Sequence, residues 1–161
     1  MAIQPKTVVT DAPWSALTYQ IIGLAMQLHN ELGPGHRESV YHNGMTLKLQ
    51  GDGRSFESEP YVPVSLADGT VVKGQCPDLV VERLVIVELK AHVYTMTPDE
   101  QAQVIGYLAA LPECPVALYL NFGRRRLEIH RLFPPRTVQA HRREKWETPV
   151  DGGRSGSGGA A

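Results

Sequence analysis

The chain has 161 residues, 42% of them hydrophobic and 20% charged, which suits one globular domain with a substantial core. No run approaches the ~18 apolar residues of a membrane span and the N-terminus shows no signal-peptide pattern, so we expect a cytoplasmic protein without a membrane partner. The net charge of -1 hides an asymmetry, because residues 124–145 carry eight basic and two acidic side chains, a local charge of +6.

Two helices are predicted in the first third of the chain. Residues 1–12 show no periodicity and are expected to be disordered, although Asp11 could cap a helix that has Pro13 in its first turn. That helix should reach residue 32, because apolar residues recur at spacings of three and four: Leu17, Ile21, Leu24, Leu28 and Leu32. Gly33-Pro34-Gly35 ends it, and a second helix is predicted over about 36–50.

Strands follow in the middle of the chain. Phe56–Leu66 is predicted to be one strand, and its two prolines indicate an edge position or a bulge. The next strand should begin at Val71, break near Gly74 and continue into Asp78 and the apolar residues after it. The apolar run that ends in Glu88-Leu89-Lys90 is predicted as its neighbour.

The last third should hold a helix and two more strands. Thr97, Pro98 and Glu100 form the pattern of a capping box, so a helix is predicted to about Leu111, with an apolar stripe at positions 105, 108 and 111. Strands are predicted over 116–122 and 127–133, and a short helix around 141–147. The fold class is therefore α/β or α+β, with a mixed central β-sheet flanked by helices.

Three charged residues stand out in this sheet. Glu88 and Lys90 share a face of their strand, because side chains alternate along a strand. Asp78 joins that face if it lies opposite Glu88, which requires an odd-length connection such as Glu82-Arg83-Leu84. Charged groups on a sheet face that would otherwise be core are costly, and such exceptions occur at functional sites.

This pattern favours a site for a hard divalent cation. Two carboxylates suit Mg²⁺ or Mn²⁺, and the backbone carbonyl of Leu89 could complete the protein ligands. Lys90 could act as a general base or through its charge, and the residues leave this choice open. A surface hairpin with alternating charges is the simpler alternative.

Further motifs favour the metal site. Pro77-Asp78 followed by Glu88-Leu89-Lys90 resembles the signature of the PD-(D/E)XK nuclease superfamily. Residues 35–41 spell G-x-x-E-x-x-Y, the motif of a bacterial family of GxxExxY proteins in that superfamily, and Gln103 to Tyr107 resembles the QxxxY motif of its RecB-like nucleases.

The resemblance implies a restriction-endonuclease-like core over residues 13–133, followed by a basic C-terminal extension over 134–150 and a disordered Gly/Ser tail over 151–161. It also implies roles. Asp78 and Glu88 would hold the metal, with Glu38 as a further acidic ligand. Lys90 would orient the attacking water, while Gln103 and Tyr107 would steady the site or contact the phosphate backbone.

The expected activity is metal-dependent hydrolysis of phosphodiester bonds, with DNA favoured over RNA. The basic side chains expected to contact phosphates are Arg124, Arg125, Arg126, Arg142 and Arg143. A homodimer is a further expectation, because many nucleases of this superfamily cut both strands as dimers.

Two alternatives stay open at this point. The first is a catalytically silent protein of the nuclease fold that binds nucleic acid or a protein partner. The second is a zinc enzyme built on His29, His36 and His42, whose spacings match no known ligand motif.

Overall fold

The computed structural model describes residues 12–147. In this range the chain forms four helices, at Pro13–Leu32 (α1), Glu38–Gly51 (α2), Pro98–Ala110 (α3) and Arg136–Glu147 (α4). Its strands are Phe56–Ser58 (β1), Val62–Ser65 (β2), Val71–Gln75 (β3), Leu79–Val81 (β4), Val85–Lys90 (β5), Val116–Asn121 (β6) and Glu128–Leu132 (β7). None of the helices described is long and apolar enough to cross a membrane.

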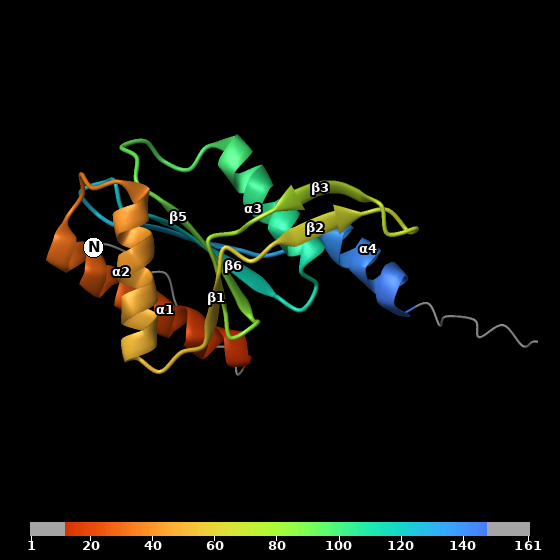
Figure 1. Ribbon diagram of the computed structural model, residues 1–161, viewed down its shortest axis with the longest axis horizontal. Helices are drawn as coiled ribbons and strands as arrows, with labels where there is room; N and C mark the ends of the chain where they lie inside the picture. Colours follow the sequence, from red (N-terminus) through yellow and green to blue (C-terminus); the bar gives the residue numbers. More distant parts are fainter. Residues whose placement is uncertain (1–11, 148–161) are drawn as a thin grey trace, which may run out of the picture.

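Five strands form the central sheet in the order β1-β4-β5-β6-β7, and β2 pairs with β3 in a separate hairpin (Figure 1). The β5 and β6 strands run parallel, joined by the crossover that contains α3, and the other neighbours are antiparallel. The predicted mixed sheet flanked by helices is confirmed.

Each face of the sheet has its own helical layer. Leu79 and Val87 face α1 and α2, whereas Val80 and Ile86 face α3. The β5 strand is buried from Val85 to Leu89 because helices cover both of its faces, which is typical of a central strand. A polar group placed on this strand is therefore held in a rigid and largely dry environment.

The region before the central hairpin differs from the prediction. The single strand expected over Phe56–Leu66 is wrong, since β1 belongs to the central sheet and β2 to the separate hairpin. The chain changes direction at Glu59, whose φ of 50° is in the left-handed region and precedes a proline. After this turn the chain leaves the central sheet and enters the hairpin of β2 and β3.

The break expected near Gly74 is also misplaced. Gly74 lies inside β3 opposite Pro63, and the chain leaves the hairpin only after Gln75. The glycine leaves room for a neighbouring side chain, because a Cβ atom there would lie 2.4 Å from the ring of Tyr61, which would have to shift. Glycine in this strand therefore marks a close contact and not an interruption.

Three details of the helices differ as well. Ala12 precedes α1 and provides no side-chain cap. The predicted cap Asp11 and the predicted disordered ends lie in residues 1–11 and 148–161, outside the described residues. The capping box of Thr97 and Glu100 is confirmed, but α3 buries Val104, Tyr107 and Leu108 in place of the stripe through position 105. The last helix begins at Arg136, earlier than expected.

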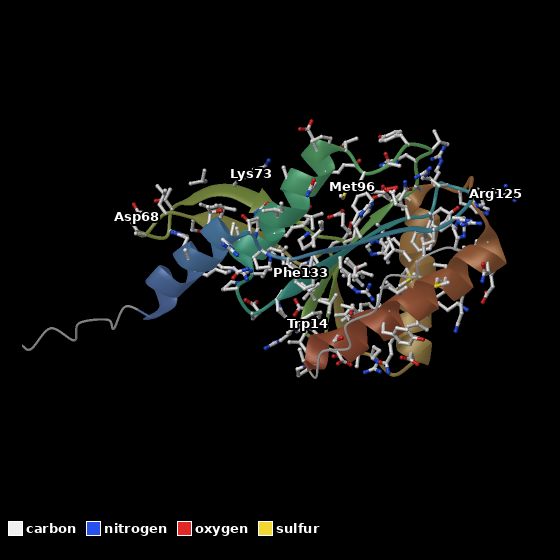
Figure 2. All side chains as sticks on the ribbon, turned by 180° about the vertical axis from the view of Figure 1, so that it is seen from behind. Trp14, Asp68, Lys73, Met96, Arg125 and Phe133 are labelled. Atoms are coloured by element: carbon white, nitrogen blue, oxygen red, sulfur yellow. The ribbon has the colours of Figure 1, made fainter. Side chains whose placement is uncertain are left out.

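Aromatic contacts fix the ends of α1 and α2. Trp14 packs edge-on against Phe133, with ring centroids 5.3 Å apart (Figure 2). Tyr41 is fully buried and stacks on Phe122 at 4.7 Å, and its hydroxyl donates to the carbonyl of Gly33. The tyrosine of the G-x-x-E-x-x-Y motif thus joins the turn between the two helices to the end of β6, which fixes where α2 begins.

Gly123, just after β6, allows a close approach that shapes the sheet end. A Cβ atom at Gly123 would lie 2.3 Å from the backbone nitrogen of His92, so Gly123→Ala should destabilise the protein by about 1–3 kcal/mol. Gly23→Ala is the matched control, because nothing lies within 4 Å of its Cβ position and alanine favours a helix by about 1 kcal/mol. Thermal unfolding should show a lower Tm for the first variant and an unchanged or higher Tm for the second; equal Tm values would contradict the tight contact.

Candidate active site

The register of the central hairpin brings the two predicted carboxylates together. Leu79 pairs with Val87 and Val81 with Val85, which leaves the three-residue connection Glu82-Arg83-Leu84. The odd-length connection required by the sequence is therefore confirmed, and Asp78 lies opposite Glu88. The Asp78 Oδ2 atom accepts a hydrogen bond of 2.7 Å from the backbone N–H of Leu89, which holds the aspartate at the end of β5.

Glu88 is the most perturbed group at this site. It is 4% exposed on the face that α3 covers, and its Oε2 atom has no hydrogen-bond partner among the described residues. Burial, and then the proximity and charge of Asp78, raise the pKa of Glu88 to about 9, against smaller opposing effects of Lys90 and Tyr107. At neutral pH the two carboxyl groups therefore retain a proton that a cation would displace.

Lys90 lies beside this pair. Its Nζ atom is 3.9 Å from Oε1 of Glu88, and one fifth of its side chain is exposed to solvent. The Lys90 carbonyl accepts the N–H of Phe122, so the strand remains paired with its parallel neighbour up to the site. The ammonium group is thus fixed next to the carboxylates yet accessible to a ligand.

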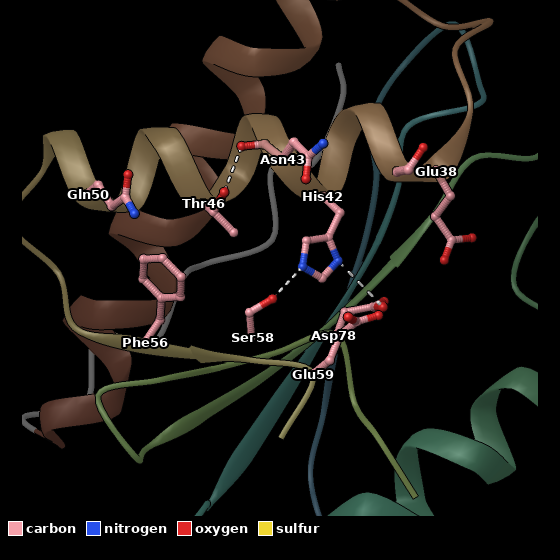
Figure 3. A pocket seen from close by; sticks show the side chains of 10 residues that line it. Glu38, His42, Asn43, Thr46, Gln50, Phe56, Ser58, Glu59 and Asp78 are labelled. Carbon is pink, nitrogen blue, oxygen red and sulfur yellow. Dashed lines mark hydrogen bonds and ion pairs between the residues drawn. The ribbon is translucent and has the colours of Figure 1, made fainter. Parts of the chain in front are cut away.

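Helix α2 adds two residues from the other side of Asp78. Glu38, in the first turn of α2, points to the same side as His42, one turn further on (Figure 3). Burial and the charge of Asp78 raise the pKa of Glu38, although Lys90 and two histidines act in the opposite direction. His42 lies between strand and helix, with Nδ1 3.8 Å from Asp78 Oδ1 and Nε2 2.8 Å from Ser58 Oγ.

Helix α3 contributes Tyr107 but not Gln103. Tyr107 is 3% exposed, and burial together with the charge of Glu88 raises the pKa of its hydroxyl, so the hydroxyl keeps its proton. Gln103 lies one turn earlier with an exposed side chain that makes no hydrogen bond within residues 12–147. The structure thus brings Asp78, Glu88, Lys90, Glu38 and Tyr107 together and leaves Gln103 at the rim.

A polar cluster next to Lys90 escaped the sequence prediction. The Nε2 atom of His92 lies 2.7 Å from Oε2 of Glu100, and the Tyr119 hydroxyl donates to the same oxygen at 2.9 Å. Burial opposes ionisation of Glu100, but the hydrogen bonds from His92, the Thr97 backbone and Tyr119 outweigh it and lower its pKa to about 2. The cluster ties the end of β5 to the start of α3. One feature of the sequence pointed to this cluster: His92 continues the spacing of two residues that places Glu88 and Lys90 on one face of the strand.

The predicted phosphate-contacting arginines occupy different environments. Arg124, Arg125 and Arg126 follow β6, which ends beside Lys90 because Lys90 pairs with Asn121. Arg125 and Arg126 are exposed, and Arg124 forms an ion pair with Glu128 at 3.5 Å.

Arg142 serves the fold. Its Nη2 atom donates to the carbonyls of Leu111 and Cys114, and burial lowers the pKa of its guanidinium. Arg143 is in α4, but its side chain lies outside the part that the structure describes.

The chemistry of the donors fits a hard divalent cation. Carboxylate and carbonyl oxygens are the ligands that Mg²⁺ and Mn²⁺ prefer, and a buried Glu88 oxygen without a partner has an unused lone pair. No group of three His, Cys, Asp or Glu side chains within residues 12–147 is arranged to hold a metal, and of the three histidines considered for zinc only His42 lies near Asp78. His29 contacts the Arg124 carbonyl and His36 the Leu32 carbonyl.

Comparison with known proteins identifies the family of this chain. The PD-(D/E)XK nuclease superfamily matches residues 15–132, a range that contains Glu38, Asp78, Glu88, Lys90 and Tyr107. A solved structure titled "Crystal structure of SSO0001" is similar at 16% identity and a TM-score of 0.49, over 69% of this chain and 59% of that chain. No curated protein matches the chain. From the family match, the chain belongs to the PD-(D/E)XK nuclease superfamily.

Proposed function

We propose that this protein is a divalent-metal-dependent nuclease that hydrolyses phosphodiester bonds, in DNA more readily than in RNA. The single observation that carries the proposal is the pair Asp78 and Glu88, held opposite each other with Lys90 on the same sheet face. A buried carboxyl pair that retains a proton is costly for folding alone, and a cation would compensate for that cost.

Asp78 and Glu88 would hold Mg²⁺ or Mn²⁺ together with the backbone carbonyl of Leu89. The N–H of Leu89 donates to the Asp78 side chain. In an antiparallel ladder the N–H and C=O of one residue point to the same neighbouring strand, so the Leu89 carbonyl also points toward the side on which Asp78 lies. Glu38 would act as a further acidic ligand, directly or through water. When bound at these oxygens, the cation supplies a Lewis acid for the phosphate and a bound water of lowered pKa.

The remaining side chains would position the reacting groups. The Lys90 ammonium can donate hydrogen bonds to the attacking water and to a phosphate oxygen, which stabilises charge that develops during hydrolysis. The protonated Tyr107 hydroxyl would favour the ionised form of Glu88. Gln103, exposed at the rim on the same helix, would contact the phosphate backbone.

The arginine turn at 124–126 supports a polyanionic substrate. It follows the strand that is paired in parallel with β5, so its exposed guanidinium groups lie at the same end of the sheet as Lys90. Contacts between arginine and phosphate supply affinity and orientation without reading sequence.

Cleavage of circular plasmid DNA and of single-stranded DNA and RNA, with Mg²⁺, Mn²⁺ or a chelator, tests the proposal. Metal-dependent cleavage is expected, with Asp78→Asn at least about 10²-fold slower because one of the two carboxylate ligands is lost. Asp68→Asn is the matched control, since Asp68 caps the exposed β2–β3 turn. A protein that binds DNA but never cuts it with either metal would instead be a silent member of the superfamily.

A further inference from the structure

A groove of about 540 Å³ opens between α2 and β1 and ends at the proposed metal site (Figure 3). Glu38 and Asp78 line both the groove and the site, so a substrate phosphate at the carboxylates would place its neighbouring nucleotide at the groove. The volume falls within the ~300–1,000 Å³ of pockets that hold small molecules, which suits one nucleoside.

The groove beyond the metal site is poorly suited to a phosphate. Of the ten residues that line it, none is lysine or arginine; Glu38 and Asp78 mark its metal end, and Glu59 is acidic. A phosphate would meet like charge there, away from the arginine turn. A neutral group that donates hydrogen bonds would instead find acceptors.

The polar wall of the groove comes from one face of α2. Ser39, Asn43, Thr46 and Gln50 recur at spacings of four, three and four, so their side chains follow the groove along the helix. The side-chain amides of Asn43 and Gln50 are exposed and make no hydrogen bond within the described residues. Amides both donate and accept, which is what the edge of a nucleobase requires.

The opposite wall supplies an aromatic surface. Phe56 of β1 is half-buried and lies across the groove from Thr46 and Gln50 (Figure 3). A base stacked on an aromatic ring contributes about 1–3 kcal/mol of affinity. A base that is still paired in a duplex cannot place both its face and its edge in so small a groove, so the base must be unpaired.

We propose that this groove is a subsite for one unpaired nucleobase next to the scissile phosphate, with Phe56 as its stacking surface and Asn43 and Gln50 as its edge contacts. This inference rests on the proposed nuclease function. Glu59 and the two amides can accept hydrogen bonds from exocyclic amino groups, so adenine and cytosine should be favoured over thymine or uracil.

The test uses fluorescent single strands of thymidine that contain one dA, one dC or one abasic residue, with the full chain and Mn²⁺. Cutting should concentrate at one bond at a fixed distance from dA or dC, at least about fivefold above the other bonds. The abasic strand should lack this preferred bond. The same assay on uridine strands with one adenosine shows, by the presence or absence of a preferred bond, whether RNA bases enter the groove.

A double variant, Asn43→Ala with Gln50→Ala, separates the groove from the metal site. It should still cut the plain thymidine strand but lose the preferred bond. Gln20→Ala with Asn30→Ala, two exposed positions on α1, is the matched control and should keep it. Uniform cutting by the wild-type protein, or an unchanged preference in the double variant, would overturn the subsite while leaving the nuclease function intact.

If no strand is cut with either metal, the nuclease function fails and the groove is tested by NMR titration with adenosine and thymidine. Adenosine should shift the side-chain amide signals of Asn43 and Gln50 at millimolar concentration, and thymidine should shift them less. Absence of any shift with adenosine would overturn the subsite as well.

Discussion

Replacement of Lys90 by alanine should slow metal-dependent cleavage by about 10²- to 10³-fold, the usual loss when one charged donor is removed from a preorganised site. The Nζ atom of Lys90 lies beside Glu88 on the face that both carboxylates share, and no other described lysine or arginine forms an ion pair with either of them. The loss should appear in kcat at saturating DNA, because the interaction strengthens as charge develops on the phosphate.

A measurement of metal affinity distinguishes the loss of the Lys90 charge from a general disruption of the metal site. Lys90 is not an oxygen ligand, and its positive charge opposes a nearby cation, so Lys90→Ala should bind Mn²⁺ as well as the wild-type protein does. Lys73→Ala, at an exposed position on β3, is the matched control for the loss of a lysine. Cleavage by Lys90→Ala within about threefold of wild type would exclude a role for Lys90 in the reaction.

Glu88→Gln should abolish cleavage and yet stabilise the metal-free protein. The pKa of Glu88 is about 9 in the fold and 4.5 for the ordinary group, so between these values the folded state binds a proton that the unfolded state releases. Stability therefore falls as the pH rises from about 5 to about 9. Glutamine is neutral at every pH, and its gain at pH 8 should be about 1–4 kcal/mol.

Thermal unfolding at two pH values checks this prediction. The Tm of Glu88→Gln should exceed that of the wild type at pH 8, by about 2–4 °C for each 1 kcal/mol, and the difference should shrink toward pH 5. Mn²⁺ should raise the Tm of the wild type more than that of the variant. Glu57→Gln, at an exposed position on β1, should change neither value. A lower Tm for Glu88→Gln at pH 8 would mean that Glu88 is ionised and paired in the fold.

The shared face of Asp78 and Glu88 could be stated from the sequence as a condition, because it requires a connection with an odd number of residues. An odd number of residues between Val81 and Val85 places Asp78 opposite Glu88, and the structure has that connection. The start of α3 could also be predicted, because it depends only on Thr97 and Glu100, which cap the helix within one turn.

The errors arise where tertiary contacts override local signals. Glu59 adopts a left-handed conformation that glutamate rarely favours, and this turn splits the expected long strand into β1 and β2. Gly74 was taken as a break, although it accommodates the ring of Tyr61. In both cases the decisive partner is a side chain or strand that sequence periodicity does not reveal.

The same reason explains which site residues were missed. His42 was considered only as a zinc ligand, because its place beside Asp78 and Ser58 depends on how α2 packs against β1 and β4. His92 lies two residues beyond Lys90, but its partners Glu100 and Tyr119 come from α3 and β6. Spacing along the chain identifies neighbours on one element and cannot identify those supplied by another.

Calorimetric titration with Mn²⁺ at pH 6, 7 and 8, in buffers of different ionisation enthalpy, tests the central claim most directly. We expect one ion per chain, with an affinity that rises with pH and a proton released on binding, since the cation must displace the proton of Glu88. Asp78→Asn and Glu88→Gln should each lose at least about tenfold in affinity, while Glu57→Gln binds as the wild type does. Binding that is independent of pH and equally tight in all three variants would show that Asp78 and Glu88 do not hold the metal.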